Sequence, residues 1–349
     1  KNLKMKFLLS TLILLLFISC NGQKNKSVET KEPNVYTDAD IVTSSLIDKN
    51  KNLWFGTSTE GLYKYEDGKF TNFNEKNSLC SNQIWSILED DKGIIWLATN
   101  KGLCKYDGKT FTQISLPYID TSSEWYKNIY PTVNPNQANS IIQDKKGIFW
   151  IGTSGGGAYK YDGKTFENIL ADKGRKYEDS LHHNVIQNII QDKKGNIWFA
   201  SMSNGGITRF DGETFKDFNN NGLSDNMVRY LYQDKKGNIW IGTNGNRNGG
   251  LDKFDGNTFT NFNEENGLCS NNVSVILESS DGKIWFGSDR AAICYYENGE
   301  IKSFEKLAGI SIRTITEDKD GNIWFGGRKG NLWRYDGEKL NDLTQLKNE

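Results

Sequence analysis

Histidine and proline are scarce in this sequence, whose 349 residues include only 2 His and 4 Pro. His182 and His183 are adjacent, and neighbours on an extended chain point opposite ways, so they do not form a pair of metal ligands. The sequence contains no His/Cys cluster, no HExxH motif, no EF-hand loop, no Gly-x-Ser-x-Gly elbow and no phosphate-binding loop. We therefore predict no metal, no cofactor and no catalytic residue, and we expect a protein that is not an enzyme.

Blocks of like charge are also missing, and no apolar run is long enough to span a bilayer. The 43 Lys and Arg residues nearly balance the 44 Asp and Glu residues, which leaves a formal net charge of −1. No basic block stands out, which argues against nucleic acid as a partner. The single long apolar run, from Phe7 to Ile18, is shorter than the roughly 20 residues that span a bilayer.

That apolar run is typical of a secretion signal. Lys6 precedes it and Ser19-Cys20 follows it, and the segment Phe17-Ile18-Ser19-Cys20 resembles the lipobox of bacterial lipoproteins, with Phe17 where Leu is usual. We predict a signal peptide at residues 1–19, a lipid anchor on Cys20, a polar tether at residues 20–38 and a folded domain at residues 39–349. A short membrane anchor or a buried helix is the alternative.

The segment after the anchor bears on location and charge. Asn21-Gly22-Gln23-Lys24 lacks the acidic residues that often mark surface lipoproteins of the Bacteroidetes type, which favours the periplasmic side of the outer membrane. We expect a monomer in the cell envelope that touches the membrane through its lipid anchor only. Removal of the signal, with its three lysines, changes the net charge from −1 to −4.

One phrase recurs seven times along the chain, as in DKKGNIWIGTN at residues 234–244. Its tryptophans are separated by 42, 54, 48, 42, 45 and 39 residues, and they are Trp54, Trp96, Trp150, Trp198, Trp240, Trp285 and Trp324. A period of 40–50 residues indicates a propeller or another repeat array. The residue two positions after each Trp is Gly or Ala, which would let adjacent sheets approach closely.

Each unit reads as four short strands joined by tight turns. A glycine stands three residues before Trp in six copies, Lys51 being the exception, and Asp-Gly or Asn-Gly joins the last two strands of every unit. With 35 Gly in the chain and no helical pattern between units, we predict an all-β seven-bladed β-propeller of four-stranded antiparallel blades. The repeat tryptophans should form its core. Either face packing alone or residues 33–40 would close the ring.

The repeats resemble the two-component regulator propeller family. The resemblance rests on NGLSDNMVRYLYQDKKGNIWIGT (221–243) followed by GGLDKFDGNTFTNF (249–262), and it extends over residues 41–340. It implies a ligand-sensing module of the periplasmic side, often linked to glycans. Because the sequence ends at Glu349 without a kinase core or receiver domain, we expect a stand-alone lipoprotein form that binds a ligand and does not transfer phosphate.

The irregular parts of the repeat indicate where a ligand binds. Insertions at 115–137 and 170–184 fall on one predicted face, and loop length that varies on one face is typical of a binding face. The position eleven residues before Trp, at the start of each first strand, is variable and mostly polar. It holds Thr43, Trp85, Asn139, Gln187, Arg229, Ser274 and Arg313. We interpret this ring of positions as the lining of a central pocket. The alternative is a rim position that faces water, where the residue type would also vary.

Further arginines and aromatic residues are predicted on the same face. The loops between second and third strands carry Arg247, Arg290 and Arg328, and the insertions carry Trp125, Tyr126, Tyr130 and Tyr177. Guanidinium groups bind carboxylate or sulfate in a bidentate manner, and aromatic faces stack on sugar rings. The sequence therefore favours an acidic or sulfated glycan fragment, or another small anion, as ligand.

Two other functions stay open at this point. The face could grip an envelope protein and act as a scaffold, with the aromatic residues of 118–130 as anchors. Alternatively, His182 or His183 could serve as the base of a propeller lyase.

Four cysteines occupy two pairs of equivalent positions. Cys80 and Cys269 lie in connectors, while Cys104 and Cys294 lie in third strands of the same two units. In an oxidising envelope this predicts disulfides Cys80–Cys104 and Cys269–Cys294. Four small buried thiols are the alternative.

Overall fold

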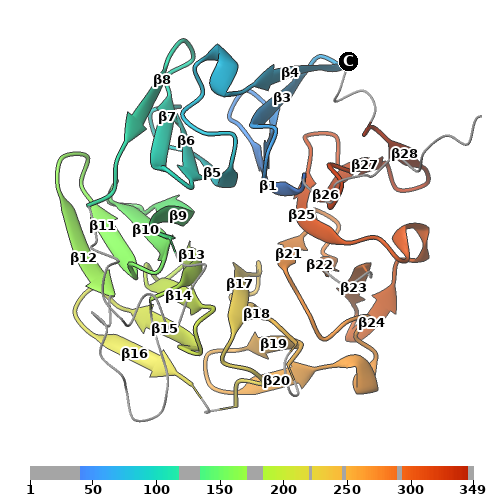
Figure 1. Cartoon of the computed structure of the whole chain (residues 1–349). Coiled ribbons are helices and arrows are strands. Elements are labelled where there is room, and N and C mark those ends of the chain that lie inside the picture. The colour runs from blue at the N-terminus through green and yellow to red at the C-terminus, as the bar shows by residue number, and fades with distance from the viewer. Residues whose placement is uncertain are drawn as a thin grey trace, which may run out of the picture. The chain divides into compact units, whose positions relative to one another are not determined.

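The computed structural model describes residues 40–117, 134–170, 184–219, 222–245, 249–288 and 293–344. In these ranges, 28 strands form seven antiparallel sheets of four strands each, and every sheet uses strands consecutive in the chain. The sheets stand around a ring with the first strand of each nearest the centre (Figure 1). The structure confirms the predicted seven-bladed β-propeller.

The blades follow one another in chain order. Blades 1 and 2 contain β1 (Val42–Ile47), β2 (Leu53–Thr57), β3 (Leu62–Glu66), β4 (Lys69–Phe73), β5 (Ile84–Glu89), β6 (Ile95–Thr99), β7 (Gly102–Tyr106) and β8 (Phe111–Ile114). Blades 3 and 4 contain β9 (Asn134–Gln143), β10 (Phe149–Ser154), β11 (Ala158–Tyr161), β12 (Phe166–Leu170), β13 (Ile186–Gln191), β14 (Ile197–Ser201), β15 (Ile207–Phe210) and β16 (Phe215–Phe218).

Blades 5 to 7 complete the ring. They contain β17 (Val228–Gln233), β18 (Ile239–Thr243), β19 (Leu251–Phe254), β20 (Phe259–Phe262), β21 (Val275–Glu278), β22 (Ile284–Gly287), β23 (Ile293–Glu297), β24 (Glu300–Ser303), β25 (Ile312–Glu317), β26 (Ile323–Gly327), β27 (Leu332–Tyr335) and β28 (Leu340–Asp342). Three short 3-10 turns lie in the connectors between blades, namely η1 (Glu75–Asn77), η2 (Glu264–Asn266) and η3 (Glu305–Leu307).

The turns between first and second strands require a residue with positive φ. Gly237 adopts φ 93° and the equivalent glycines of five other blades behave alike. Lys51, which replaces glycine in blade 1, adopts φ 71° at the same place. The local geometry is therefore kept even where the residue type departs from the repeat.

The seven repeat tryptophans build the core between blades, as predicted. All seven are at most 6% exposed. Trp324 of blade 7 contacts Phe55 of blade 1 with ring centroids 5.6 Å apart, so the last blade packs on the first as the others pack on their neighbours. A Cβ added at Gly56 would lie 2.6 Å from Ile84 of the next blade. This confirms that the small position after Trp permits close approach of the sheets.

Each tryptophan is also held by a hydrogen bond that the sequence analysis missed. The indole Nε1 donates to the carboxylate of the Asp six residues earlier, as from Trp240 to Asp234 at 2.9 Å. The same bond occurs in five more blades, while Trp285 donates to Ser279 Oγ at 3.1 Å. The first residue of each turn thus anchors the core residue of its own blade.

A second repeated bond, the blade clasp, joins neighbouring blades. The second residue of the turn between first and second strands donates its backbone N–H to the side chain that ends the next blade's first strand. Lys193 N to Gln233 Oε1, at 2.7 Å, is an example. Six of the seven interfaces have this clasp. The interface between blades 7 and 1 lacks it, because Ile47 stands where the acceptor should be.

Ring closure combines face packing with backbone bridges from the start of the domain. Ile41 pairs with Arg328 of blade 7, and the carbonyl of Asp40 accepts the N–H of Gly330 at 3.0 Å. The side-chain oxygens of Ser45 and Thr314 lie 2.6 Å apart across the same interface. No described strand crosses from one terminal blade into the other.

Candidate functional site

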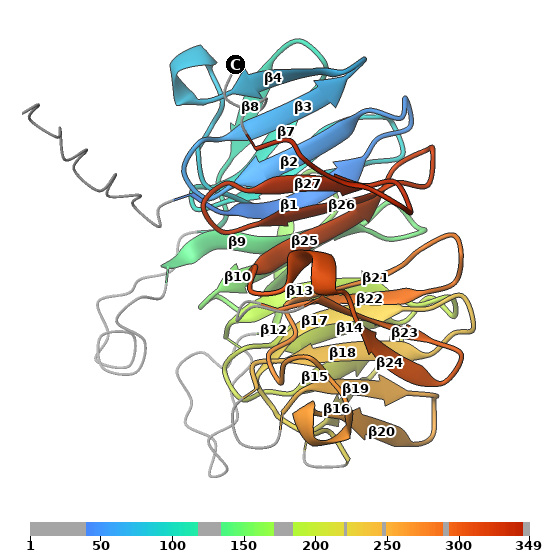
Figure 2. The ribbon, with the colours of Figure 1, turned by 90° about the vertical axis from the view of Figure 1, so that its right-hand side faces the viewer.

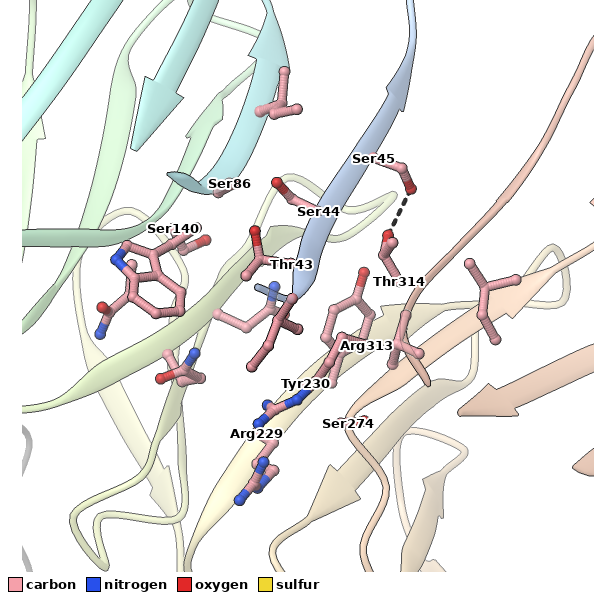
Figure 3. A pocket seen from close by; sticks show the side chains of 18 of the residues that line it. Thr43, Ser44, Ser45, Ser86, Ser140, Arg229, Tyr230, Ser274, Arg313 and Thr314 are labelled. Carbon is pink, nitrogen blue, oxygen red and sulfur yellow. Dashed lines mark hydrogen bonds between the residues drawn. The ribbon is translucent and has the colours of Figure 1, made fainter. Parts of the chain in front are cut away.

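A pocket of about 390 Å³ opens at the centre of the ring, where the seven first strands begin (Figure 3). All seven residues of the variable position line it. We call them the pocket ring, and they are Thr43, Trp85, Asn139, Gln187, Arg229, Ser274 and Arg313. The structure therefore brings together, from seven blades, the residues that the sequence analysis grouped by register alone.

The pocket ring is formed by β-bulges. In blade 1, Val42 pairs with Thr57 and Ser44 pairs with Gly56, so Thr43 between them has no partner residue. Five other first strands skip their ring residue in the same way. Ser274 lies just before β21, and its N–H and Oγ both bond the Gly287 carbonyl. A bulge bends the strand and re-aims one side chain, which explains how the other six ring residues reach the pocket.

Three members of the ring have side chains committed to the neighbouring blade. Asn139 Nδ2 donates to the Ile186 carbonyl at 3.2 Å, and Ser274 Oγ donates to the Ile312 carbonyl at 2.9 Å. Thr43 Oγ1 donates to the equivalent carbonyl of Ile84. These bonds hold blades together, so the three residues are less available for a ligand than the sequence suggested.

The other four ring residues are Trp85, Gln187, Arg229 and Arg313, and they give the pocket two different sides. Trp85 comes from blade 2, and its indole Nε1 is buried without a hydrogen-bond partner in the described residues. Gln187 comes from blade 4. The two arginines come from blades 5 and 7, and both lie in the same part of the pocket in Figure 3. The lining thus combines one indole with two guanidinium groups, from three different blades.

The described lining of the pocket has basic side chains and no acidic ones. Two guanidinium groups and no carboxylate are found among the described residues that line it. The N–H donors of Arg forks match carboxylate, sulfate and phosphate oxygens. Low dielectric walls strengthen such a field toward an anion.

Arg229 is oriented by residues behind it. Its Nε donates to Asn244 Oδ1 at 2.7 Å, and Asn272 Nδ2 of the following connector donates to the Asn244 carbonyl at 2.9 Å. Asn272 is buried. These hydrogen bonds hold the Nε of Arg229 in place and so set the direction of its terminal nitrogens. A side chain that is already ordered loses less conformational entropy when a ligand binds.

A neutral tyrosine neighbours Arg229 in the pocket wall. Burial, with a smaller effect of Tyr232, raises the pKa of Tyr230 to about 12. The phenol therefore keeps its proton at physiological pH and can donate a hydrogen bond. It adds a neutral hydrogen-bond donor to the pocket lining.

Other predicted site residues lie elsewhere. Arg328 is exposed at the end of β26 and does not line the pocket. The remaining predicted positions fall outside the described residues. They are Cys20, Trp125, Tyr126, Tyr130, Tyr177, His182, His183, Arg247 and Arg290.

The structure joins the same cysteine pairs that the sequence suggested. Cys80–Cys104 and Cys269–Cys294 both have Cα atoms 5.9 Å apart and tie a connector to the third strand of blades 2 and 6. Blade 5 has Ser224 and Asp252 at the same two positions, and Ser224 Oγ donates to Asp252 Oδ2 at 2.9 Å. Burial raises the pKa of Asp252 to about 6. This polar substitute for a disulfide was not foreseen.

The described residues have neither a metal-binding cluster nor a membrane-spanning helix. Within the ranges named above, no group of His, Cys, Asp and Glu is arranged to hold a metal ion. None of the helices in those ranges is long and apolar enough to cross a membrane.

The fold is a seven-bladed β-propeller with a pocket at the centre of its ring. Six segments match the model of the two component regulator propeller family, at residues 78–101, 132–155, 180–203, 222–245, 267–290 and 306–329. Each covers a connector and the first two strands of one blade. The chain is therefore built from repeats of the two-component regulator propeller family.

Relatives are longer proteins with similar repeats. A 90-residue stretch is 33% identical to histidine kinase P4 of Formosa agariphila, which covers 26% of this chain and 6% of the relative. The extracellular domain of a hybrid two-component system from B. thetaiotaomicron superposes with a TM-score of 0.65 at 24% identity, over 84% of this chain and 39% of that chain. This chain thus spans less than half the length of both.

Propellers of another class share the fold. Virginiamycin B lyase from Staphylococcus aureus, determined with quinupristin, superposes with a TM-score of 0.66 at 14% identity, over 87% of this chain and 97% of that chain. At this identity the likeness concerns the architecture alone.

Proposed function

We propose that this chain is a cell-envelope binding module whose propeller holds a small anion in the central pocket, an acidic or sulfated glycan fragment being the ligand class that fits best. The observation that carries the proposal is the pairing of Arg229 and Arg313 in a pocket whose described lining has no carboxylate. Trp85, another lining residue, offers an aromatic surface for a sugar ring.

The proteins in which similar repeats and a similar fold occur support a sensor role. They match the two-component regulator propeller family, and a related fold occurs as the extracellular domain of a hybrid two-component system. The lipobox-like segment that ends at Cys20 agrees with a location in the envelope. In this view the pocket ring detects the ligand and another protein reads out its occupancy.

Binding of acidic oligosaccharides to the purified protein tests this proposal. Ligands are first sought by thermal shift on a panel of uronic-acid and sulfated fragments, and affinities are then measured by calorimetry. Replacing Arg229 and Arg313 together with Ala should weaken binding of any hit at least tenfold, because each lost charge-assisted bond costs about 1.5–3 kcal/mol.

A matched control uses two arginines remote from the pocket. Arg209 and Arg334 lie over the rings of Trp198 and Trp324, each 5.9 Å from the ring centroid. Their double Ala variant should bind the hit like the unaltered protein. Equal losses in both double variants, or no loss in the pocket variant, would show that the ligand binds elsewhere.

The same samples separate binding from turnover. A propeller lyase would consume the hit, and chromatography of the ligand after incubation would reveal a new product. Recovery of the intact ligand supports the binding module.

A further inference from the structure

Four consecutive blades present a lysine on the face opposite the pocket. These residues occupy the third position of the turn between first and second strands. We call Lys92, Lys146, Lys194 and Lys236 the lysine crescent. The same position holds Asn50, Asp281 and Asp320 in blades 1, 6 and 7. Figure 2 shows the disc edge-on, with the turn between β21 and β22 on the side opposite the start of β9.

The acidic residue of these turns does not neutralise the crescent at the surface. Asp192 and Asp234, which open two of the turns, are only 5% and 4% exposed. Their carboxylates accept hydrogen bonds from the Trp indole and from backbone N–H groups inside the blade. In blades 3 to 5 the turn therefore directs its negative charge into the protein and its positive charge toward solvent, whereas the blade 2 turn also has an exposed carboxylate, that of Asp91, beside Lys92.

The lysine that precedes the crescent residue in a turn forms hydrogen bonds to the next blade, whereas the crescent lysine does not. Lys145 Nζ donates to the Lys193 carbonyl at 3.3 Å, and Lys235 Nζ donates to the Ser279 carbonyl at 3.0 Å, so second-position lysines join blades. Across the described residues, the ammonium groups of the crescent form no ion pair and no hydrogen bond, and all four are exposed. Stability of the propeller does not explain their presence.

The charge on this face is unevenly distributed. Blades 6 and 7 carry Asp281 and Asp320 in place of crescent lysines, together with Glu278 and Glu317 at the ends of their first strands. Farther out, Asp162, Asp211 and Asp255 of the Asp-Gly turns are exposed, and backbone N–H donors lower the pKa of each carboxyl. The crescent is thus a basic strip near the axis, over blades 2 to 5 only.

The composition of the strip favours lipid headgroups over a protein partner. Protein interfaces are enriched in Tyr, Trp and Arg and depleted in Lys, and the four crescent turns contain no aromatic residue and no arginine. Lysine is a compact, hydrated point charge that suits a diffuse layer of phosphates. Each lysine near an anionic bilayer contributes about 1 kcal/mol.

We propose that the lysine crescent rests on an anionic phospholipid surface, so that the pocket ring opens away from that surface. Sequence alone placed the membrane contact at the lipid anchor, and the crescent adds a second contact that orients the disc. This inference is independent of the pocket ligand.

Vesicle binding of the whole chain tests the proposal. The variant K146Q/K194Q/K236Q is compared with K76Q/K101Q/K329Q, which removes three exposed lysines from the pocket side. On vesicles of phosphatidylglycerol and phosphatidylcholine, the crescent variant should bind roughly a hundredfold more weakly than the unaltered chain. The control should stay within about twofold. Both variants keep the same N-terminal segment, so its contribution cancels.

Amine labelling on the vesicles provides the second readout. Lys146, Lys194 and Lys236 should be protected from an amine-reactive reagent on anionic vesicles and labelled on pure phosphatidylcholine. Equal labelling on both, or equal loss of affinity in the two triple variants, would overturn the proposal. Tighter binding to soluble polyglutamate than to anionic vesicles would also overturn it, by assigning the crescent to an acidic protein.

Discussion

At the scale of single residues, the turn aspartate governs each blade. Asp234 accepts bonds from Trp240 Nε1 at 2.9 Å, from Asn238 N at 2.8 Å and from Asn238 Nδ2 at 2.7 Å. One buried carboxylate therefore fixes both the hairpin turn and the core indole. Loss of such an acceptor leaves buried donors unpaired, which costs more than the bond itself contributes.

We predict that Asp234→Ala lowers the free energy of unfolding by about 2–4 kcal/mol, because three donors lose their acceptor. Asp234→Ser should cost less, since Ser279 already bonds Trp285 in blade 6. Urea unfolding followed by tryptophan fluorescence measures both. The explanation would be wrong if Ser and Ala variants were equally destabilised.

Asp252 makes stability depend on pH. Its folded pKa of about 6 lies above the ordinary value of 3.8, so the folded protein holds the proton more tightly than the unfolded chain. Stability should then fall as pH rises from about 4 to about 6, by on the order of 2–3 kcal/mol. Asp252→Asn should remove this part of the pH dependence.

Unfolding of the unaltered protein and Asp252→Asn at pH 4 and pH 7 checks the sign. The free energy of unfolding of Asp252→Asn, taken relative to that of the unaltered protein, should be higher at pH 7 than at pH 4. An unchanged difference would show that Asp252 titrates normally.

At the scale of elements, the connectors are fastened to third strands. Blades 2 and 6 use disulfides, and blade 5 uses the Ser224–Asp252 hydrogen bond at the equivalent place. These fastenings lie on the pocket side, where the connectors run from one blade to the next. They limit the freedom of that face with either a covalent or a polar link.

The equivalence predicts a third disulfide in the variant S224C/D252C. Cross-linking the connector to the strand should raise the free energy of unfolding by about 3 kcal/mol, because the bridge closes a loop in the unfolded chain and so lowers its conformational entropy. Mass analysis with alkylation shows whether the bridge forms, and thermal melting with and without reductant measures its effect. Absence of the bridge in oxidised protein would disprove the structural equivalence, and the two single Cys variants serve as controls.

At the scale of the whole molecule, the ring has one distinct interface. Six interfaces carry the blade clasp, whereas blades 7 and 1 meet without it because Ile47 cannot accept a hydrogen bond. Bridges from Asp40 and Ile41 to blade 7 join this interface from the pocket side. Apart from packing, the described seam is joined inside the strands by the Ser45–Thr314 hydrogen bond, and its turn side lacks the clasp.

We predict that Ile47→Gln supplies the missing acceptor to Lys319 N–H. Amide exchange at Lys319 should slow several-fold, equivalent to about 0.5–1.5 kcal/mol for one hydrogen bond. The reverse change, Gln233→Leu, should speed exchange at Lys193 by a similar factor. Mass-spectrometric hydrogen exchange of the two turns gives the comparison, and no slowing at Lys319 would exclude a clasp at the seam.

Repeat register made most of the fold predictable. The spacing of Trp54 to Trp324, the turn glycines and the Asp-Gly pairs each report local geometry, and all agree on seven antiparallel blades. The grouping of Arg229 and Arg313 with five other positions also came from register, since equivalent positions in a closed ring must face the same axis. The ligand that the pocket takes stays a prediction.

Bulges and side-chain bonds could not be read from the sequence. A bulge breaks the two-residue alternation without a marker residue, because Thr43, Trp85 and Arg229 share no chemistry. The commitment of Thr43, Asn139 and Ser274 to carbonyls of the next blade depends on how far apart the blades stand. That distance is a property of the closed ring.

By itself, the sequence determined the number of blades, the turns and the buried indoles, because these follow from short-range periodicity and from the residues that tight turns require. Only the tertiary structure decided which ring residues bond to the neighbouring blade, where Asp252 replaces a disulfide, and that the seam lacks a clasp. Those features arise between segments distant in the chain, where the spacing of packed sheets sets which donors meet which acceptors.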